Sequence, residues 1–466
     1  IVGDPDQTIY TWRGANIRFL LNFDKKFPNV KTILMNDNYR SSPEILAAAN
    51  SLIAKNKNRF NKNLIAHRPS GPKVTCFMEK TAGEEADRVA KEIIELHKKG
   101  VPYKDITLLY RAHYVTRNLE EKLLKKKIPY TIYSGTQFFG RMEIKDALCY
   151  LRMIVSQDDM AFRRIINKPK RNIGQRRMEF LTNYASENGC TLFEALRKNV
   201  EEPTLKCTGA ADFIELIDTF AKDSEGKPVS EVLSAILDES GYEKMLRTDG
   251  SQERLDNLAE LKQSVFEYET TCGEETNIVH YLEHAALFSN MDTGEGQDKV
   301  KLMTVHTAKG LEFPYVFICG MNEGIFPSRK TRTVNAMEEE RRLAFVAMTR
   351  AEKALYITEA GGANLDGSPR YPSRFILDID RDKLEFDSPV DEQLMKETMV
   401  YVGRSTAFLQ EDKDETTMEA GTRVRHPVFG PGTIVEVDGS AHAYLIKFDS
   451  MPTMRQISFH ARLFKL

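Results

Sequence analysis

The stretch Lys301-Leu302-Met303-Thr304-Val305-His306-Thr307-Ala308-Lys309-Gly310-Leu311-Glu312-Phe313 starts as a largely apolar run and continues as a polar turn that contains a glycine. A run of this kind bounded by a turn predicts a β-strand whose end carries exposed polar side chains. Beyond it the sequence predicts a strand over 315–319, a long helix over 336–349 and a further strand over 354–358. Because strands that alternate with helices tend to pair in parallel, this part of the chain is predicted to be α/β.

The same alternation occurs nearer the N-terminus, between Asn29 and Arg152. Strands are expected over 30–35, 73–78, 106–110 and 130–133, and helices over 43–56, 84–99 and 119–127. Between the two α/β segments, from about residue 160 to 291, helical periodicity replaces the strand signals. The sequence therefore predicts one parallel sheet, built from residues 35–155 and 295–380, that is interrupted by an all-helical insertion over 156–294.

The C-terminal residues differ in character from the rest. Residues 381–420 are polar, include the run Glu411-Asp412-Lys413-Asp414-Glu415 and lack apolar periodicity, so we expect a flexible linker. Residues 421–466 hold short strand signals separated by Gly430-Pro431-Gly432, Asp438-Gly439 and Asp449-Ser450. Short strands with turns at this spacing predict a small SH3-like or Tudor-like β-barrel.

Composition excludes several classes of protein. The formal net charge is -2 with 29% charged residues, so no overall electrostatic attraction to nucleic acid or to an acidic membrane is expected, and any DNA site must be local. The six cysteines are widely spaced, without a CxxC pair, which favours free thiols over a zinc site or disulfides. The sequence shows neither an apolar run of about 20 residues nor a signal-peptide pattern. We therefore expect a cytoplasmic protein with no membrane partner and no protein-bound metal.

Three further strings contain polar and aromatic residues that no folding rule requires. The first, Ile1-Val2-Gly3-Asp4-Pro5-Asp6-Gln7-Thr8-Ile9-Tyr10-Thr11-Trp12-Arg13-Gly14-Ala15, holds the only tryptophan of the chain. Taken alone, Trp12 is explained equally well as core filling, but an indole beside Tyr10 and Arg13 also suits the stacking of unpaired bases. The other two strings are Asn38-Tyr39-Arg40-Ser41-Ser42-Pro43-Glu44-Ile45-Leu46 and Glu338-Glu339-Glu340-Arg341-Arg342-Leu343-Ala344-Phe345-Val346-Ala347-Met348-Thr349-Arg350-Ala351.

In chain order, these four strings resemble motifs III, IV, V and VI of the superfamily 1 DNA helicases of the UvrD/PcrA/Rep type. The resemblance implies an ATP-dependent helicase or translocase that moves 3′ to 5′ and that uses ATP and Mg²⁺. It also implies that residues 1–34 are the C-terminal remnant of a first motor domain (1A). The predicted sheet would then be the second RecA-like motor domain (2A), and the helical insertion would be domain 2B.

The resemblance assigns the nucleotide-binding residues. Gln7 is expected near the γ-phosphate, where it couples the nucleotide state to DNA binding, and Tyr39 is expected to contact the base. Arg40 and Arg350 are expected to contact the γ-phosphate, a task that suits the fixed, always charged guanidinium fork. The resemblance places Glu312 at the nucleotide sugar. Gln7, Arg40 and Arg350 are thus the expected catalytic residues.

The DNA-binding residues are assigned in the same way. The expected single-strand contacts are Tyr10, Trp12, Arg13, Arg111, Thr304 and His306, although His306 has an alternative interpretation as a hydrogen-bonded turn residue. Within the insertion, the basic string Asn167-Lys168-Pro169-Lys170-Arg171-Asn172-Ile173-Gly174-Gln175-Arg176-Arg177 resembles the segment that touches duplex DNA in this family. Lys170, Arg171 and Gly174 are the expected contacts there, because a helix N-terminus beside cations binds phosphate.

A P-loop is missing from the sequence. The only Gly-Lys pair is Gly226-Lys227, which is followed by Pro228 instead of Ser or Thr. The main ligands of the phosphates and of magnesium therefore have no candidates in these residues. We expect a partial chain that starts at motif III and that does not hydrolyse ATP by itself.

Two alternatives belong to other classes of protein. The chain could be an adaptor that binds DNA and RNA polymerase without catalysis, since residues 421–466 resemble the Tudor-like tail that docks on RNA polymerase in PcrA and UvrD. Retention of the motif glutamine, glutamate and arginines favours the motor over the adaptor. A purely structural scaffold leaves the polar strings unexplained.

Overall fold

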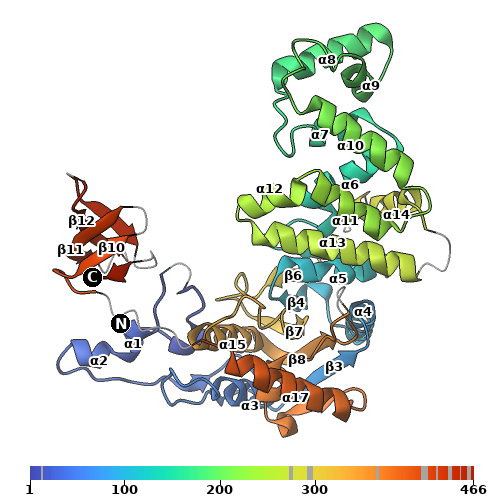
Figure 1. Cartoon of the computed structure of the whole chain (residues 1–466). Coiled ribbons are helices and arrows are strands. Elements are labelled where there is room, and N and C mark those ends of the chain that lie inside the picture. Colours follow the sequence, from blue (N-terminus) through green and yellow to red (C-terminus); the bar gives the residue numbers. More distant parts are fainter. Residues whose placement is uncertain are drawn as a thin grey trace.

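A computed structural model describes residues 1–11, 14–271, 276–290, 297–363, 367–410, 418–426, 429–438, 443–451, 453–458 and 463–466. Its centre is a seven-stranded sheet with the order β5-β6-β4-β7-β8-β3-β9, in which every pairing is parallel (Figure 1). The strands are β3 (Val74–Glu79), β4 (Ile106–Tyr110), β5 (Tyr130–Ile132), β6 (Val300–Thr304), β7 (Phe313–Cys319), β8 (Ala351–Ala360) and β9 (Leu384–Phe386). The predicted parallel α/β sheet is thereby confirmed.

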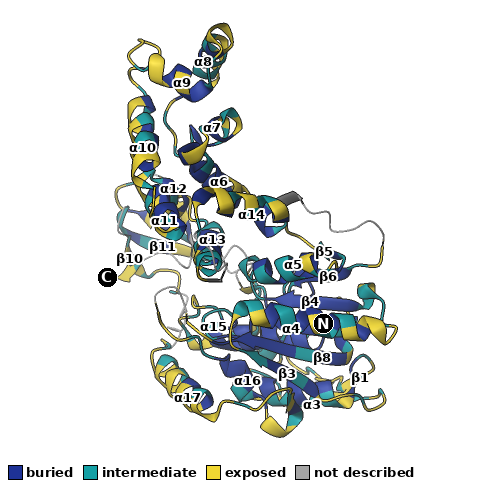
Figure 2. Cartoon of the chain, turned by 90° about the vertical axis from the view of Figure 1, so that its right-hand side faces the viewer, coloured by how far each residue is buried: buried dark blue, intermediate teal, exposed yellow. Residues whose placement is uncertain are grey.

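Helices cover both faces of this sheet. Leu108 and Tyr110 of β4 belong to one apolar core with α4 (Ala82–Lys98) and α5 (Thr116–Lys125). Leu109, between them, belongs to the opposite core with α3 (Pro43–Ile53), α15 (Val334–Met348) and α16 (Arg374–Asp378). Successive side chains of a strand point to opposite faces, so a strand covered on both sides is apolar throughout. This explains the wholly buried sequence of β4, and Figure 2 shows the buried strands between their helices.

The register of the strands positions the functional loops. Tyr110, the last residue of β4, lies opposite Thr304 of β6 on one side and Cys319 of β7 on the other. The carboxyl ends of these strands therefore meet at one edge of the sheet. This is the edge where ligands bind in open parallel sheets.

Between β5 and β6, the described residues form helices and no strand. The α-helices are α6 (Met142–Val155), α7 (Asp159–Ile165), α8 (Gln175–Asn188), α9 (Leu192–Lys198), α10 (Ala210–Asp223), α11 (Val229–Glu239), α12 (Tyr242–Thr248), α13 (Gln252–Thr271) and α14 (Ile278–Asn290). They extend away from the sheet, and α8 and α9 lie at the far end (Figure 1). The apolar core on the α4 and α5 face of the sheet continues into these helices.

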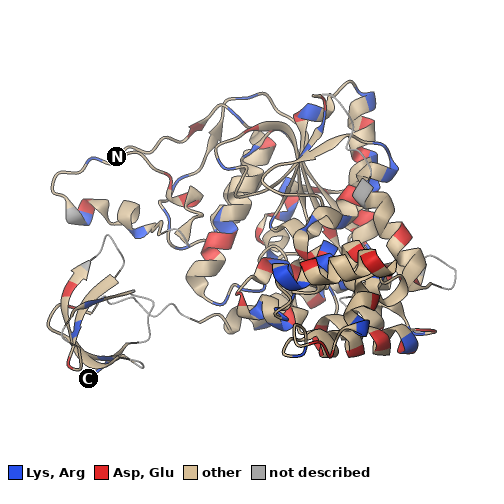
Figure 3. Cartoon of the chain, turned by 90° about the horizontal axis from the view of Figure 1, so that it is seen from above, with Lys and Arg blue, Asp and Glu red and all other residues tan. Residues whose placement is uncertain are grey.

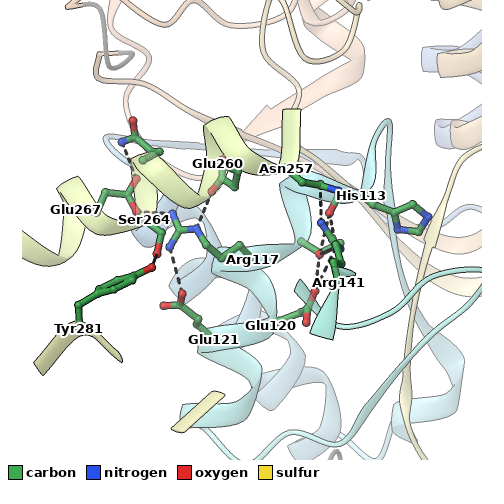
Figure 4. A network of polar contacts seen from close by, with 12 residues as sticks. His113, Arg117, Glu120, Glu121, Arg141, Asn257, Glu260, Ser264, Glu267 and Tyr281 are labelled. Carbon is green, nitrogen blue, oxygen red and sulfur yellow. Dashed lines mark hydrogen bonds and ion pairs between the residues drawn. The ribbon is translucent and has the colours of Figure 1, made fainter. Parts of the chain in front are cut away.

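A buried polar network joins α5 of the sheet layer to α13 (Figure 4). The side chain of Arg117 is only 3% exposed and donates to Glu260 at 2.7 Å and to Glu121 at 3.2 Å, with Glu267 as a third carboxylate partner. Close by, Arg141 Nη1 donates to Asn257 Oδ1 at 2.8 Å. The orientation of the helical segment on the sheet thus depends on a few specific polar contacts as well as on the shared core.

Apart from α3, the first 66 residues contain little regular structure. They form α1 (Arg18–Leu21), α2 (Phe23–Lys26) and the short parallel pair β1 (Asp37–Asn38) and β2 (Ile65–Ala66). The strand expected over 30–35 is wrong: these residues pair with no strand in the described part of the chain, and Ile33 and Met35 are 74% and 81% exposed. A strand forms where its backbone N–H and C=O groups can bond to a neighbouring strand. In the described residues no strand lies beside 30–35.

The expected flexible linker over 381–420 is also corrected by the structure. β9 adds to the sheet edge beside β3, and α17 (Glu392–Ala407) follows, capped by Asp391, whose carboxylate accepts from the backbone N–H groups of Gln393 and Leu394. The buried residues of α17 are Met395 and Thr398, so the helix lacks the apolar stripe that sequence periodicity detects. The acidic run Glu411–Glu415 lies outside the described residues.

The last residues form a separate small antiparallel sheet with the order β13-β12-β11-β10-β14. Its strands are β10 (Arg423–His426), β11 (Gly430–Asp438), β12 (Ala443–Phe448), β13 (Arg455–Ser458) and β14 (Phe464–Lys465). Val424, Ile434, Ile446 and Phe448 are fully buried in its core. This arrangement is compatible with the predicted small β domain.

Charges of both signs are interspersed on the helices seen from above (Figure 3). Among the described residues, no helix is both long enough and apolar enough to cross a membrane.

Candidate functional site

The turn after β6 brings several polar side chains to the carboxyl edge of the sheet. Thr304 Oγ1 lies 3.0 Å from Thr307 Oγ1 and accepts from the Thr307 N–H at 3.3 Å, which closes the turn locally. Gly310 has φ +88°, a backbone conformation that favours glycine. The quoted string Lys301–Phe313 therefore folds as predicted, as a strand followed by a turn that carries polar side chains.

Three cations gather at one side of this turn. Arg350 is 2% exposed, and its guanidinium donates to the carbonyl oxygens of Leu311 (2.9 Å) and Val346 (3.1 Å). Arg40 Nε donates to Glu312 Oε2 at 2.7 Å, and Arg40 Nη1 donates to the Thr349 carbonyl at 3.4 Å. Lys309 Nζ donates to the carbonyl oxygen of Gln7 at 2.8 Å. The structure thus brings Arg40, Glu312 and Arg350 together, as expected of a shared nucleotide site.

The electrostatics of this cluster favour an anion. Burial, and then the charge of Arg40, lower the pKa of Arg350 to about 10. Burial and Arg350 also lower the pKa of Lys309. Neither Arg350 nor Lys309 forms an ion pair with a carboxylate in the described part of the chain. Partly desolvated cations that lack a counter-ion are stabilised by a bound anion, and phosphate oxygens suit both guanidinium and ammonium groups.

Gln7 lies beside the cluster, but its side chain is turned away. Gln7 Nε2 donates to Asp4 Oδ2 at 2.8 Å, and Asp4 in turn accepts from Lys62 Nζ at 2.6 Å. The neighbouring Asp6 is fully buried and accepts two hydrogen bonds from Arg59 at 3.0 and 3.2 Å. These ion pairs hold the N-terminal string against the segment that follows α3. A role for Gln7 at a phosphate requires its side chain to leave Asp4.

Tyr39 is placed where a base could reach it. Tyr39 precedes Arg40 in the sequence and is 71% exposed, so its ring is accessible to a ligand. One face of its ring lies against the imidazole of His67, with ring centroids 4.6 Å apart.

A cleft of about 530 Å³ lies between the N-terminal string, the carboxyl edge of the sheet and α13. Thr304, His306 and Arg111 line it, and Tyr10 Oη donates to the carbonyl of His306 at 2.9 Å. Burial, and then the charge of Arg111, lower the pKa of His306 to about 4, so its imidazole is neutral near pH 7. The structure therefore gathers four of the six expected single-strand contacts, and Trp12 and Arg13 lie outside the described residues.

Arg111 does not present a free charge to this cleft. Its Nε and Nη2 atoms donate to the carboxylate of Glu340 at 2.7 to 3.1 Å. Glu339, Glu253 and Asp256 also line the cleft. A DNA backbone in this cleft must therefore compete with Glu340 for Arg111.

In the helical segment, the basic string divides into structural and exposed residues. Arg171 donates to the carbonyl oxygens of Ile165 and Ile166 at 3.1 and 3.2 Å, and its guanidinium lies 4.8 Å from the centre of the Phe213 ring. This side chain fixes the loop and, as placed, is not available to a phosphate. Lys170, Gly174 and Arg176 are exposed, and Gly174 and Arg176 line a hollow at the N-terminus of α8. This hollow is remote from the carboxyl edge of the sheet (Figure 1).

Several residues around the site were not singled out by the sequence analysis. Lys309 lies inside the string Lys301–Phe313. A lysine in a string expected to bind nucleotide and DNA was a sequence signal for a phosphate-binding residue. Arg342, in the last string, is 3% exposed and its Nε donates to the carbonyl of Thr8 at 2.9 Å. His67 is in no motif, and nothing in the sequence indicates its contact with Tyr39. In the described residues, no group of three or more His, Cys, Asp or Glu side chains is arranged to hold a metal ion.

Comparison with known proteins gives matches over most of the chain. Residues 33–361 match the family model of the UvrD-like helicase C-terminal domain, and residues 1–28 match that of the UvrD/REP helicase N-terminal domain. The chain is 37% identical over 458 residues to the ATP-dependent DNA helicase PcrA of Staphylococcus aureus strain Mu50, and 38% identical over 456 residues to that of Staphylococcus epidermidis strain RP62A. Each match covers 94% of this chain and 62% of the relative, so the chain spans less than two thirds of the length of these relatives.

Proposed function

The chain belongs to the UvrD-like helicase family, and on this premise we propose that it is part of an ATP-dependent DNA helicase and translocase that moves 3′ to 5′. The observation that carries the proposal is the cluster of Arg40, Lys309 and Arg350. Arg40 follows the exposed Tyr39 directly, and Lys309 contacts Tyr10, whose hydroxyl donates to His306 at the edge of the cleft. Such an arrangement suits a nucleotide on one side and a nucleic-acid backbone on the other.

The nucleotide is held, in this proposal, by residues of the described site. Tyr39 stacks on the base, Glu312 accepts hydrogen bonds from the sugar, and Arg40 and Arg350 bind the γ-phosphate. Arg350 is 2% exposed and donates to two backbone carbonyls, so its guanidinium must exchange at least one of these hydrogen bonds for the phosphate. ATP supplies the phosphoryl group whose transfer to water drives movement. The Arg40 side chain must then leave Glu312 for the phosphate. This exchange costs little, because the two side chains are 28% and 55% exposed and ion pairs at such positions contribute about 0 to 1 kcal/mol.

Coupling between nucleotide and DNA follows from the N-terminal string. Gln7 and Tyr10 are three residues apart, and Lys309 contacts both, through the Gln7 carbonyl and at 5.0 Å from the centre of the Tyr10 ring. A shift of Gln7 toward a phosphate therefore moves the residues that line the DNA cleft. Stacking on aromatic rings contributes about 1 to 3 kcal/mol per base, enough for such a shift to change the affinity for DNA severalfold.

We also propose the division of the chain that the sequence suggests. Residues 1–34 are part of motor domain 1A, residues 35–155 and 295–380 form the RecA-like domain 2A, and residues 156–294 form domain 2B. Within 2B, Lys170, Gly174 and Arg176 contact the duplex, with Arg171 supporting the loop. Residues 421–466 form a Tudor-like domain that docks on RNA polymerase, and its resemblance to the PcrA and UvrD tail supports this assignment.

The experiment is a DNA-stimulated ATPase and unwinding assay on the full-length protein that contains this chain. Expected results are hydrolysis stimulated by single-stranded DNA and unwinding of a duplex with a 3′ tail in preference to one with a 5′ tail. Residues 1–466 alone are expected to show no ATPase activity, because they contain no GxxxxGK[ST] sequence. Binding of DNA and RNA polymerase by a full-length protein without turnover would instead support the adaptor.

A further inference from the structure

The ring of Tyr39 is supported on one face only. His67 stacks against it with an angle of 19° between the ring planes, and the residue nevertheless remains 71% exposed. The face away from His67 is therefore accessible to a second ring. Aromatic rings in such offset stacks contribute free energy beyond the area that they bury.

His67 is itself held in a defined orientation. Its Nε2 atom lies 2.7 Å from Asp37 Oδ1, and its backbone N–H donates to the carbonyl of Asn38 at 2.9 Å. The parallel pair β1 and β2 places the segments around Asp37 and His67 side by side, with Asp37 opposite Ile65 and Asn38 opposite Ala66. Asp37 and His67, whose side chains are 59% and 43% exposed, thus form a hydrogen-bonded support that lies behind Tyr39.

This support stands at one end of the proposed nucleotide site. Arg40 follows Tyr39 directly and reaches Glu312 and the backbone of Thr349. Because Tyr39 and Arg40 are consecutive residues, one small molecule that carries both a flat ring and a phosphate could contact both. A nucleotide meets this requirement, and a purine offers a larger stacking surface than a pyrimidine.

We propose that His67, oriented by Asp37, is a positioning residue of the nucleotide site that holds the Tyr39 ring for stacking on a purine base. The inference rests on the proposed function, namely that the protein binds and hydrolyses ATP. A Tyr39 ring already restricted by His67 loses less conformational freedom when the nucleotide binds, so the affinity is higher. His67 does not contact the phosphates, so its removal changes nucleotide binding and leaves the chemical step intact.

The test compares variants of the full-length protein in two assays. One measures KM and kcat for ATP and for CTP in DNA-stimulated hydrolysis, and the other measures Kd for ATP by displacement of a fluorescent ATP analogue. The variants are His67→Ala, which removes the stacked ring, His67→Phe, which keeps a ring without the Asp37 contact, and Asp37→Ala. The matched control is His280→Ala, which removes an exposed histidine on α14 in the helical segment.

His67→Ala is expected to raise KM and Kd for ATP about two- to ten-fold, with kcat within about two-fold of the unmodified protein. The increase should be smaller for CTP, His67→Phe should restore most of the affinity, and Asp37→Ala should fall between His67→Ala and the unmodified protein. An unchanged affinity for ATP in His67→Ala overturns the inference while the proposed function stands. Equal increases for ATP and CTP, or a His67→Phe variant as weak as His67→Ala, also overturn it, because they indicate a general defect. A full-length protein that binds no nucleotide overturns both the inference and the proposed function.

Discussion

The attachment of the helical segment to the sheet can be tested at Arg117. Replacement by Gln removes the cation that three carboxylates share, those of Glu121, Glu260 and Glu267. Burial already raises the pKa of Glu260, with Arg117 acting in the opposite direction. Without Arg117, these carboxylates repel one another in a poorly hydrated site.

The expected loss of stability depends on how far the three carboxylates are buried. Removing one partner of a buried ion pair costs about 3 to 5 kcal/mol. Glu121 and Glu260 are 12% and 17% exposed, but Glu267 is 31% exposed and can turn toward water, so the lower end of that range applies. We therefore expect Arg117→Gln to destabilise the contact between α5 and α13 by about 3 kcal/mol, roughly a hundred-fold in its opening equilibrium.

The assay is native-state hydrogen exchange of amides in α5 and α13, because a chain with several folding units has no single free energy of unfolding. The matched control is Arg197→Gln, since Arg197 pairs with Asp218 at 43% and 33% exposure and its loss should cost less than about 1 kcal/mol. Adding Glu260→Gln to Arg117→Gln should recover part of the loss, because one uncompensated carboxylate is removed. If Arg117→Gln and Arg197→Gln change the amide exchange rates of α5 and α13 equally, the buried network does not hold the helical segment on the sheet.

The other predictions concern catalysis, pH, DNA binding and the C-terminal sheet. In the full-length protein, Arg350→Ala should lower kcat for ATP by about 10³-fold or more while DNA binding is largely kept, because a γ-phosphate arginine acts on the transition state; a near-normal kcat contradicts this role. Burial, and then the charge of Glu85, raise the pKa of Glu359 from 4.5 to about 8. The folded state therefore keeps a proton that the unfolded state releases, so stability should fall as pH rises from 4.5 to about 8, and Glu359→Gln should flatten this dependence in the native-state hydrogen exchange of β8 amides measured at several pH values. The double variant Lys170→Gln, Arg176→Gln should weaken duplex binding and lower the slope of log K against log salt by about two, whereas an unchanged slope removes both residues from the interface. Deletion of residues 421–466 should leave unwinding intact and weaken co-precipitation of RNA polymerase, and undiminished co-precipitation excludes this segment as the docking site.

Much of the local structure could be predicted because it depends on short-range pattern. The strand over 106–110 was expected with the bounds that β4 has, since five successive apolar or β-branched residues fit a strand covered on both faces. The helix α17 could not be predicted, because its stability comes from an N-cap and from few buried side chains instead of from an apolar stripe. The strand expected over 30–35 failed for the opposite reason, since its apolar pattern has no neighbouring strand in the described residues.

The sequence by itself determined the order of the motifs, the parallel α/β class and the candidate residues, because these depend on residue type and spacing along the chain. Only the tertiary structure decided which candidates are available. It paired Arg40 with Glu312 and buried Arg350 against backbone carbonyls. It turned Gln7 toward Asp4, paired Arg111 with Glu340 and used Arg171 to hold a loop. It also placed His67 behind Tyr39. Partners such as Arg111 and Glu340 are 229 residues apart in the sequence, and pairing over such distances depends on how strands and helices pack, which local pattern does not encode.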